Sequence, residues 1–267
     1  MKSIGIVTYY NAINCGAFLQ ALALQMYLER EGFKPYIVDT GVNFLPPIFE
    51  DSHNTTWWQH NAATIQNARR IFKISQNRKY DAIVYGSDQI WNLVEHSQNP
   101  IFWGYHLQAE KKISYATCST WLRADTLVKN PCKTLMAAWG LIHNFQAISV
   151  RDTRTKKIVK LLSLRNAKEC LDPTFLVDFS QYKGENKRGK YIVVYTFGLQ
   201  PENIAEIKKF AASKNCKIIY AGSYCDWADE NPILNPFEWL NLIYHAAYVF
   251  TNTFHGCVFS LIFHKEF

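Results

Sequence analysis

Short apolar runs alternate with amphipathic stretches along the N-terminal part of the chain. Apolar runs bounded by polar turns predict buried strands, whereas apolar positions three or four residues apart predict helices. We expect strands at Ser3–Tyr9, Pro35–Asp39, Tyr80–Tyr85, Lys112–Thr117 and Ala147–Val150, and helices at Ala17–Glu31 and Asp152–Leu162. The stretch rich in Pro and Asn around Trp57 and Trp58 is expected to be a loop.

The same alternation starts again after a polar segment, Phe179–Lys190, which predicts a linker. Beyond it we expect strands at Tyr191–Thr196, Lys217–Ala221 and Tyr248–Thr251, and helices at Pro201–Lys214, at Phe237–Ala246 and from Gly256 onward. Apolar strands separated by helices predict an α/β fold with two Rossmann-like doubly wound domains, residues 1–180 and 190–267. Such a domain has about five or six strands, so we expect the second domain to be incomplete at its C-terminus.

Composition narrows the class of protein. Hydrophobic residues make up 48% of the chain, which is enough for sizeable cores, yet no apolar run is long enough to span a bilayer. The first residues run directly into a strand, so no secretion signal is visible. The seven cysteines form no C-x-x-C pair, which argues against a zinc site or a disulfide framework and favours the cytoplasm.

The net charge of +7 is moderate and dispersed. Lys156-Lys157 and Lys187-Arg188 are short basic clusters, typical of solvated faces rather than of nucleic-acid grips. An anionic small molecule or an anionic lipid surface would suit this balance, and no nucleic-acid partner is expected.

Several predicted strands end in a short polar segment, which we call a polar corner. The first polar corner lies between the first strand and the first helix. Asn14 and Gly16 stand there, at the carboxyl end of a strand, where open α/β sheets bind ligands. They either contact a ligand or only shape the turn. The corner lacks G-x-G-x-x-G, so a dinucleotide fingerprint is absent. Cys15, near a helix N-terminus, is expected to have a lowered pKa.

Ser87 and Asp88 form the second corner, at the end of the strand Tyr80–Tyr85. Asp88 is a candidate general base toward a hydroxyl, or a group that orients a sugar. Alternatively, Ser87 and Asp88 cap the next helix.

Arg151 ends another apolar strand at the same predicted sheet edge. Its planar fork suits a carboxylate or phosphate ligand, although a pair with Asp152 or another carboxylate would explain it equally. Asp172-Pro173 is expected to be a structural turn.

The segment from Val249 to Ser260 contains the most informative corner. An apolar strand runs to Thr251, and a helix is expected to begin near His255 and Gly256. Such a junction presents unpaired backbone N–H groups to an anion, His255 adds a group that transfers protons near neutral pH, and Gly256 allows close approach. The alternative is a histidine satisfied at an ordinary strand–helix turn.

Several of these pieces, in this order, resemble the polysaccharide pyruvyl transferase family. The resemblance rests on Gly5–Tyr10, Asn14–Ala21, Gly86–Asn92, Ser114–Ala116, Ser149–Asp152, Leu171–Thr174 and Thr251–Gly256. The chain departs from the family pattern at Cys15, where an aromatic residue is common, and at Asn252, where Asp is common. The family also continues past the His-Gly helix, so we expect the chain to be a truncated product or a fragment.

The resemblance implies a GT-B-like fold with the active site in the cleft between two domains. It implies transfer of a pyruvyl group from phosphoenolpyruvate to a sugar of a cell-surface polysaccharide or its lipid-linked precursor, with formation of a ketal and release of phosphate. Within that scheme His255 and Asp88 are the catalytic candidates, and the substrate-binding candidates are Arg151, Asn14, Gly16, Ser87 and Gly256. No metal or organic cofactor is required. The protein is expected in the cytoplasm, peripheral at the membrane if the acceptor is lipid-linked.

Two rival interpretations remain open at this point. A nucleotide-sugar glycosyltransferase of the same fold class would bind a diphosphate at the same helix N-terminus. An inactive fragment or a binding protein would have no transferase activity at all.

Overall fold

The computed structural model describes residues 1–93, 95–120 and 122–267, and the chain forms two compact units. Unit 1 comprises Met1–Ala12, Ala17–Asn43 and Arg70–Val177. Unit 2 comprises Ile13–Gly16, Phe44–Arg69 and Asp178–Phe267. The units are therefore not contiguous in sequence, and the domain boundaries 1–180 and 190–267 stay a prediction.

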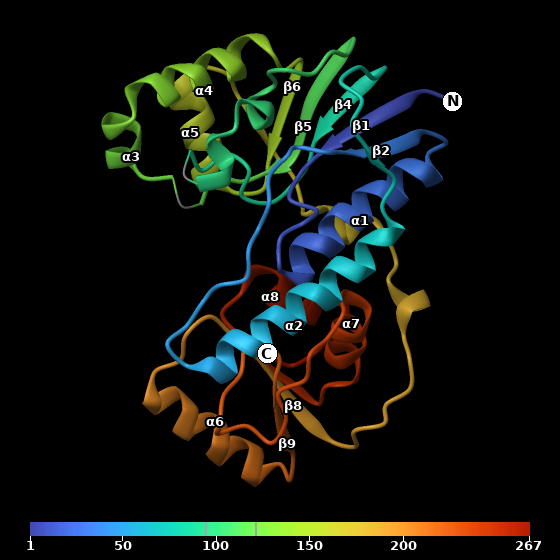
Figure 1. Ribbon diagram of the computed structural model, residues 1–267, viewed down its shortest axis with the longest axis vertical. Helices are drawn as coiled ribbons and strands as arrows, with labels where there is room; N and C mark the ends of the chain where they lie inside the picture. Colours follow the sequence, from blue (N-terminus) through green and yellow to red (C-terminus); the bar gives the residue numbers. More distant parts are fainter. Residues whose placement is uncertain (94, 121) are drawn as a thin grey trace. The chain divides into compact units, whose positions relative to one another are not determined.

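Unit 1 is built on a parallel sheet of seven strands (Figure 1). In chain order the strands are β1 (Ser3–Val7), β2 (Lys34–Val38), β3 (Ile74–Ser75), β4 (Ala82–Tyr85), β5 (Lys111–Thr117), β6 (Ala147–Val150) and β7 (Lys168–Glu169). Their order in the sheet is β3-β2-β1-β4-β5-β6-β7, and every neighbouring pair is parallel. The predicted Rossmann-like α/β fold is thus confirmed, with the strand order reversing between β1 and β4.

Helices connect these strands. They are α1 (Cys15–Arg30), α3 (Ala124–Lys129), α4 (Pro131–His143) and α5 (Thr153–Ser163), with short 3₁₀ turns η1 (Arg69–Ile71), η2 (Glu95–Gln98), η3 (Pro100–Trp103) and η4 (Pro173–Leu176). The connection from β1 to β2 runs in one direction along the sheet, and those from β4 to β7 run in the other. Because such connections are right-handed, α1 lies on one face of the sheet and α4 and α5 lie on the other (Figure 1). Strand side chains such as Ile6, Ile83 and Tyr85 are fully buried between these layers.

The expected loop around Trp57 and Trp58 is wrong over much of its length, because Ser52–Ala68 forms helix α2. Asp51 caps this helix by accepting hydrogen bonds from the backbone N–H groups of His53 and Asn54. The many Asn and Thr residues of the segment have low helix propensity, which hides the helix in the sequence. Packing compensates for this, since Trp57 and Ile65 are buried.

Unit 2 contains a parallel sheet of three strands in the order β10-β8-β9. The strands are β8 (Tyr191–Tyr195), β9 (Lys217–Tyr220) and β10 (Tyr248–Thr251), and the helices are α6 (Pro201–Ser213), α7 (Pro236–His245) and α8 (Phe254–Ile262), with the 3₁₀ turn η5 (Ser180–Tyr182). All the strands and helices predicted beyond residue 190 are present. The chain moves from β8 to β9 on one side and returns to β10 on the other, so the strand order reverses between β8 and β10.

Candidate active site

The first polar corner lies at the carboxyl ends of β1 and β4, where the strand order of unit 1 reverses. Thr8 follows β1 and donates its hydroxyl to the carbonyl oxygen of Ser87, 2.8 Å away, just after β4. Gln20 on α1 donates from Nε2 to Thr8 Oγ1 at 2.9 Å, and its Oε1 is buried with no hydrogen-bond partner among the described residues. Open parallel sheets bind ligands at such a reversal, which makes this corner the candidate site of unit 1.

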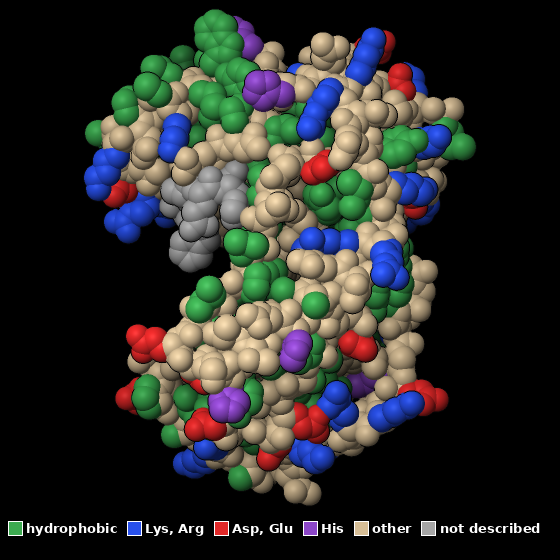
Figure 2. Space-filling view, viewed as in Figure 1, with side chains coloured by type: hydrophobic (Ala, Val, Ile, Leu, Met, Phe, Trp, Pro, Cys, Tyr) green, Lys and Arg blue, Asp and Glu red, His purple; other side chains and the backbone are tan. Residues whose placement is uncertain are grey.

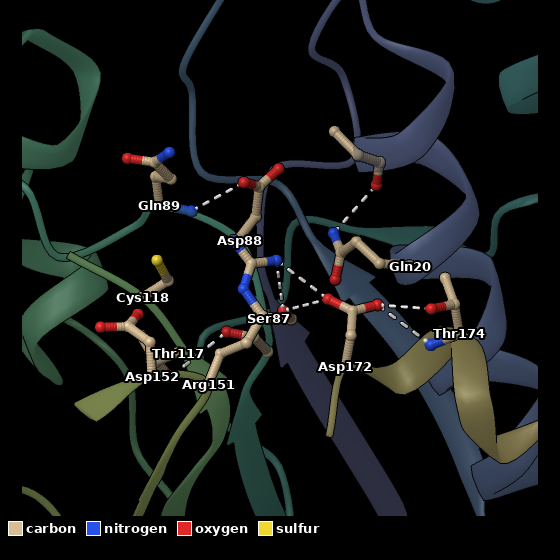
Figure 3. A network of polar contacts seen from close by, with 12 residues as sticks. Gln20, Ser87, Asp88, Gln89, Thr117, Cys118, Arg151, Asp152, Asp172 and Thr174 are labelled. Carbon is tan, nitrogen blue, oxygen red and sulfur yellow. Dashed lines mark hydrogen bonds and ion pairs between the residues drawn. The ribbon is translucent and has the colours of Figure 1, made fainter. Parts of the chain in front are cut away.

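A buried ion pair lies at the centre of this corner (Figure 3). Arg151 Nη1 lies 2.9 Å from Asp172 Oδ2, and the two side chains are only 7% and 0% exposed. Ser87 Oγ donates to the same carboxylate oxygen at 2.7 Å. Of the two interpretations of Arg151, the pair with a carboxylate is therefore realised, and the partner is Asp172. Asp152 instead caps α5, accepting from Thr155 N at 2.7 Å.

Asp172, expected only to form a structural turn, also belongs to this network. It does begin the turn η4, but its carboxylate also anchors the network from a position that is 1% exposed. Its Oδ1 accepts from Thr174 N at 3.1 Å and from Thr174 Oγ1 at 2.8 Å, while Oδ2 accepts from Arg151 and Ser87. An Asp-Pro-Thr sequence alone is indistinguishable from a surface turn, so the sequence carried no local signal for the burial of Asp172.

Asp88 lies beside this pair in a left-handed backbone conformation, with φ of 74°. Its backbone carbonyl accepts from Cys118 N at 3.0 Å, which attaches the residue to the end of β5. Its side chain is half-buried and accepts from Gln89 N at 2.8 Å. This contact is to the next residue and caps no helix, so helix capping does not explain Asp88.

The charge of Arg151 is well supported by its surroundings. Burial alone would lower its pKa, but the electrostatic effects of Cys118, Asp172 and Asp88, together with the hydrogen bond to Asp172, raise the pKa above its ordinary value. A guanidinium carries five N–H donors. The pair with Asp172 therefore orients the fork without by itself exhausting its capacity to bind an anion.

The second polar corner lies in unit 2, where β10 leads into α8. Thr253 caps α8 by accepting from Gly256 N at 3.0 Å. His255 lies in the first turn of α8 and is 7% exposed. Because strand order reverses between β8 and β10, this helix N-terminus again stands at a reversal point of a parallel sheet.

Two glycines allow close packing around the first turn of α8. A Cβ atom on Gly16 would overlap the His255 ring, so this position in the first turn of α1 requires glycine. A Cβ atom on Gly256 would overlap the hydroxyls of Thr251 and Thr253, the second of which caps the helix. Close packing thus explains both glycines, and their contact with a ligand stays a prediction.

The expected low pKa of Cys15 is wrong. Burial is the main cause that raises its pKa, with the negative charge of Glu238 adding to the effect. Tyr195, whose pKa burial also raises, hydrogen-bonds the side chain of Asn14. Asn14 therefore has a partner in the protein, and a catalytic thiolate at Cys15 is not supported.

The structure thus brings Ser87, Asp88 and Arg151 together in unit 1 and Gly16, His255 and Gly256 together in unit 2. That Arg151 and His255 bind one anion stays a prediction.

Comparisons with known proteins identify the family and the fold class of the chain. A family model described as polysaccharide pyruvyl transferase matches residues 14–267. No curated protein sequence matches. No helix in the part of the chain that the structure describes combines the length and hydrophobicity needed to cross a bilayer.

Similar solved structures include UDP-GlcNAc 2-epimerase from Methanocaldococcus jannaschii, with 11% identity, a TM-score of 0.51 and coverage of 98% of this chain and 82% of that one. UDP-N-acetylglucosamine 2-epimerase from Rickettsia bellii has 9% identity, a TM-score of 0.48, and coverage of 100% and 78%. The glycosyltransferase SsfS6 from Streptomyces sp. SF2575 has 8% identity, a TM-score of 0.43, and coverage of 97% and 78%. At such identities the likeness to the Methanocaldococcus epimerase concerns the fold alone, and the expected GT-B-like class is confirmed.

Proposed function

Because the chain belongs to the polysaccharide pyruvyl transferase family, we propose that it transfers a pyruvyl group from phosphoenolpyruvate to two hydroxyls of a saccharide, forming a ketal. The observation that supports this most directly is the buried Arg151 cation, oriented by Asp172 and Ser87 at the reversal point of the first sheet. A fixed guanidinium suits a donor that carries both a carboxylate and a phosphate.

The reaction consumes one donor and two acceptor hydroxyls. A proton adds to the methylene carbon of phosphoenolpyruvate, and the first hydroxyl oxygen bonds to C2 and gives up its proton. The bond between C2 and the phosphate oxygen then breaks, and phosphate leaves with the electron pair. The second hydroxyl oxygen bonds to C2 and loses its proton, which completes the ketal and leaves inorganic phosphate as the other product.

In unit 1, Arg151 binds an anionic group of the donor, and Asp88 accepts the proton of an attacking hydroxyl or orients the acceptor. Asp88 suits this task because its side chain is only half-buried and its backbone is held rigidly at the end of β5. Ser87 contributes by orienting the Arg151–Asp172 pair.

In unit 2, His255 delivers the proton to the methylene carbon or binds the phosphate. Backbone N–H groups of the first turn of α8 and the helix dipole favour an anion there. Gly16 leaves room for the His255 ring, and Gly256 leaves room for the Thr251 and Thr253 hydroxyls at the start of α8. Asn14 is assigned to substrate binding near the same turn. A positioned acid or base contributes about 10²–10⁴-fold to such a reaction.

The acceptor in this proposal is a saccharide of a cell-surface polysaccharide or of its lipid-linked precursor at the inner membrane face. The protein then works in the cytoplasm, where phosphoenolpyruvate is available.

A donor screen tests the proposal. Purified protein is incubated with saccharide acceptors and either phosphoenolpyruvate or nucleotide sugars, and phosphate release and acceptor mass are measured. We expect turnover with phosphoenolpyruvate only. Consumption of a nucleotide sugar instead would establish the rival glycosyltransferase function.

Calorimetry with phosphoenolpyruvate tests the residues. Losing one charged hydrogen-bond partner costs about 1.5–3 kcal/mol, so Arg151→Met and His255→Gln should each weaken binding about ten- to a hundredfold. Arg165→Met and His245→Gln are matched controls, since both side chains hydrogen-bond only backbone carbonyls in the contacts described. If both residues bind one donor, their effects should not add in the double variant. Unchanged affinity in both folded variants removes them from the site.

A further inference from the structure

Helix α4 carries an apolar stripe on its outer face. Leu135, Trp139 and Ile142 are 70%, 61% and 45% exposed, and their spacing of four and three residues places them on one side of the helix. The inner side of the same helix is also apolar, because Ala137 and Leu141 are buried. Helix α4 therefore has an exposed apolar stripe in addition to its buried apolar side.

Exposed apolar side chains are also present on the two neighbouring helices. Val128 near the end of α3 is 80% exposed, and Leu161 and Leu164 at the end of α5 are 69% and 80% exposed. Both helices pack against α4. Figure 2 shows hydrophobic side chains gathered over the part of the molecule that Figure 1 labels α3 and α4, with Lys and Arg at the border. We call this face, with Val128, Leu135, Trp139, Ile142, Leu161 and Leu164, the α3–α5 surface.

The positive charge of the chain is concentrated in the same segment. Residues 122–165 contain nine Lys and Arg and two Asp and Glu, an excess of seven positive charges. The whole chain has 29 Lys and Arg against 22 Asp and Glu, so the rest of the chain has 20 of each and is neutral. Lys156, Lys157 and Lys160 of this segment are exposed on α5. Within this segment Arg151 is buried in its pair with Asp172, whereas helices α3, α4 and α5 themselves carry six Lys and Arg and one Asp. The helices with the exposed apolar side chains therefore carry most of this excess.

The combination of exposed apolar and basic side chains indicates which partner this surface binds. Helices with Trp and Leu on one face and Lys at its sides bind in the headgroup region of membranes, and anionic lipids attract such basic segments. A second copy of the chain would place two strongly positive surfaces against each other, which opposes self-association. We propose that the α3–α5 surface binds the surface of an anionic phospholipid bilayer. The proposal concerns unit 1 alone and does not depend on the identity of the donor.

Cosedimentation with vesicles tests this proposal. The full chain is mixed with vesicles of phosphatidylcholine containing phosphatidylglycerol, or of phosphatidylcholine alone, with no donor or acceptor present. We expect binding to the anionic vesicles that weakens as salt is raised. Binding that is absent, or equally strong to both kinds of vesicle, would overturn the proposal.

Variants separate the two contributions. The triple variant Lys156→Gln/Lys157→Gln/Lys160→Gln should lose about a hundredfold in affinity, since each charge near an anionic surface contributes about fivefold. Its control is Lys187→Gln/Lys208→Gln/Lys209→Gln, three exposed lysines of unit 2. Leu135→Ser/Trp139→Ser should lose at least about tenfold, and its control is Leu45→Ser/Ile48→Ser, at side chains 83% and 87% exposed. Equal losses in variants and controls would refute a specific surface.

A site-specific probe completes the test. Cys132 lies exposed in the first turn of α4, whereas the other six cysteines are buried or half-buried. An environment-sensitive fluorophore on Cys132 should shift to the blue with anionic vesicles. Sedimentation equilibrium without lipid should show a monomer. A dimer that Leu135→Ser/Trp139→Ser dissociates would instead assign the surface to self-association.

Discussion

Replacement of Arg151 by methionine probes the buried network of unit 1. The substitution keeps most of the side-chain volume but leaves the carboxylate of Asp172 buried without its cation. Removing one partner of a buried ion pair costs about 3–5 kcal/mol. The remaining donors, Ser87 Oγ and the two groups of Thr174, are all within 3.1 Å of Asp172 and retain part of the stabilisation. We therefore expect a loss near the lower end of that range.

Asp172→Asn is expected to lose a similar amount for a geometric reason. Both oxygens of Asp172 accept hydrogen bonds, so the amide NH₂ of asparagine must face donors whichever way it turns. Turned toward Thr174, it meets a backbone N–H that cannot reverse. Turned toward Arg151, it meets Ser87, whose hydroxyl can rotate to accept, but also the guanidinium, which cannot.

The double variant Arg151→Met/Asp172→Asn resolves this conflict. With the guanidinium gone, the amide NH₂ donates to Ser87 Oγ, while the amide oxygen keeps both contacts from Thr174. A buried pair replaced by neutral groups of similar shape is often close to neutral in stability. The double variant should therefore be more stable than either single variant, with a coupling energy of about 2 kcal/mol or more. Urea unfolding, monitored by circular dichroism, measures all four proteins.

The same set separates stability from function. If Arg151 binds the donor, the double variant should fold well and still fail to bind phosphoenolpyruvate in calorimetry. Additive losses in the unfolding experiment would refute the reasoning about the network. Wild-type affinity in the stable double variant would make Arg151 purely structural.

Three further outcomes follow from the structure. Gly16→Ala should lower the free energy of unfolding by about 1–3 kcal/mol, measured by urea unfolding, because the new methyl group overlaps the His255 ring. The pKa of Asp81 is lowered chiefly by the Ser3 hydroxyl, so its stabilising contribution is present above the ordinary value of 3.8 and is lost as the pH falls through the lower folded pKa. Asp81→Asn should flatten that part of the unfolding profile in acid, and an unchanged profile would contradict this. Cys15 should resist alkylation in the native protein and react only on unfolding, followed by mass spectrometry, because burial raises its pKa.

Much of the fold could be predicted from the sequence because buried parallel strands are continuous apolar runs. Tyr191–Tyr195 and Ala82–Tyr85 are recognisable for this reason, and the polar residues after them follow from the position of strand ends. Helix α2 could not be predicted in the same way, since its stability comes from tertiary packing of Trp57 and Ile65 rather than from its own propensity. The two-residue strands β3 and β7 are too short to form any pattern.

The candidate site shows the same division. The positions of Ser87 and Arg151 at one sheet edge follow from strand periodicity alone. The position of their partner Asp172 does not follow from strand periodicity. Asp172 comes after β7, the last strand of the sheet, and no local pattern predicts that the chain there reaches Arg151. Chemistry at strand ends was therefore visible in the sequence, whereas the pairing that orients it was not.

Asn252 illustrates why the identity of a residue acquires meaning only with its partner. The family commonly has Asp at this position, and the sequence alone presents the amide as a departure. In unit 2 the Asn252 side chain binds the backbone of one residue twice: its Oδ1 accepts from Phe197 N at 2.9 Å, and its Nδ2 donates to Phe197 O at 3.1 Å. A carboxylate could make the first bond but would face the carbonyl oxygen without a proton to donate. The amide thus ties the end of β8 to the end of β10, beside the turn that leads to His255, and in this chain the substitution is explained by the backbone that it binds.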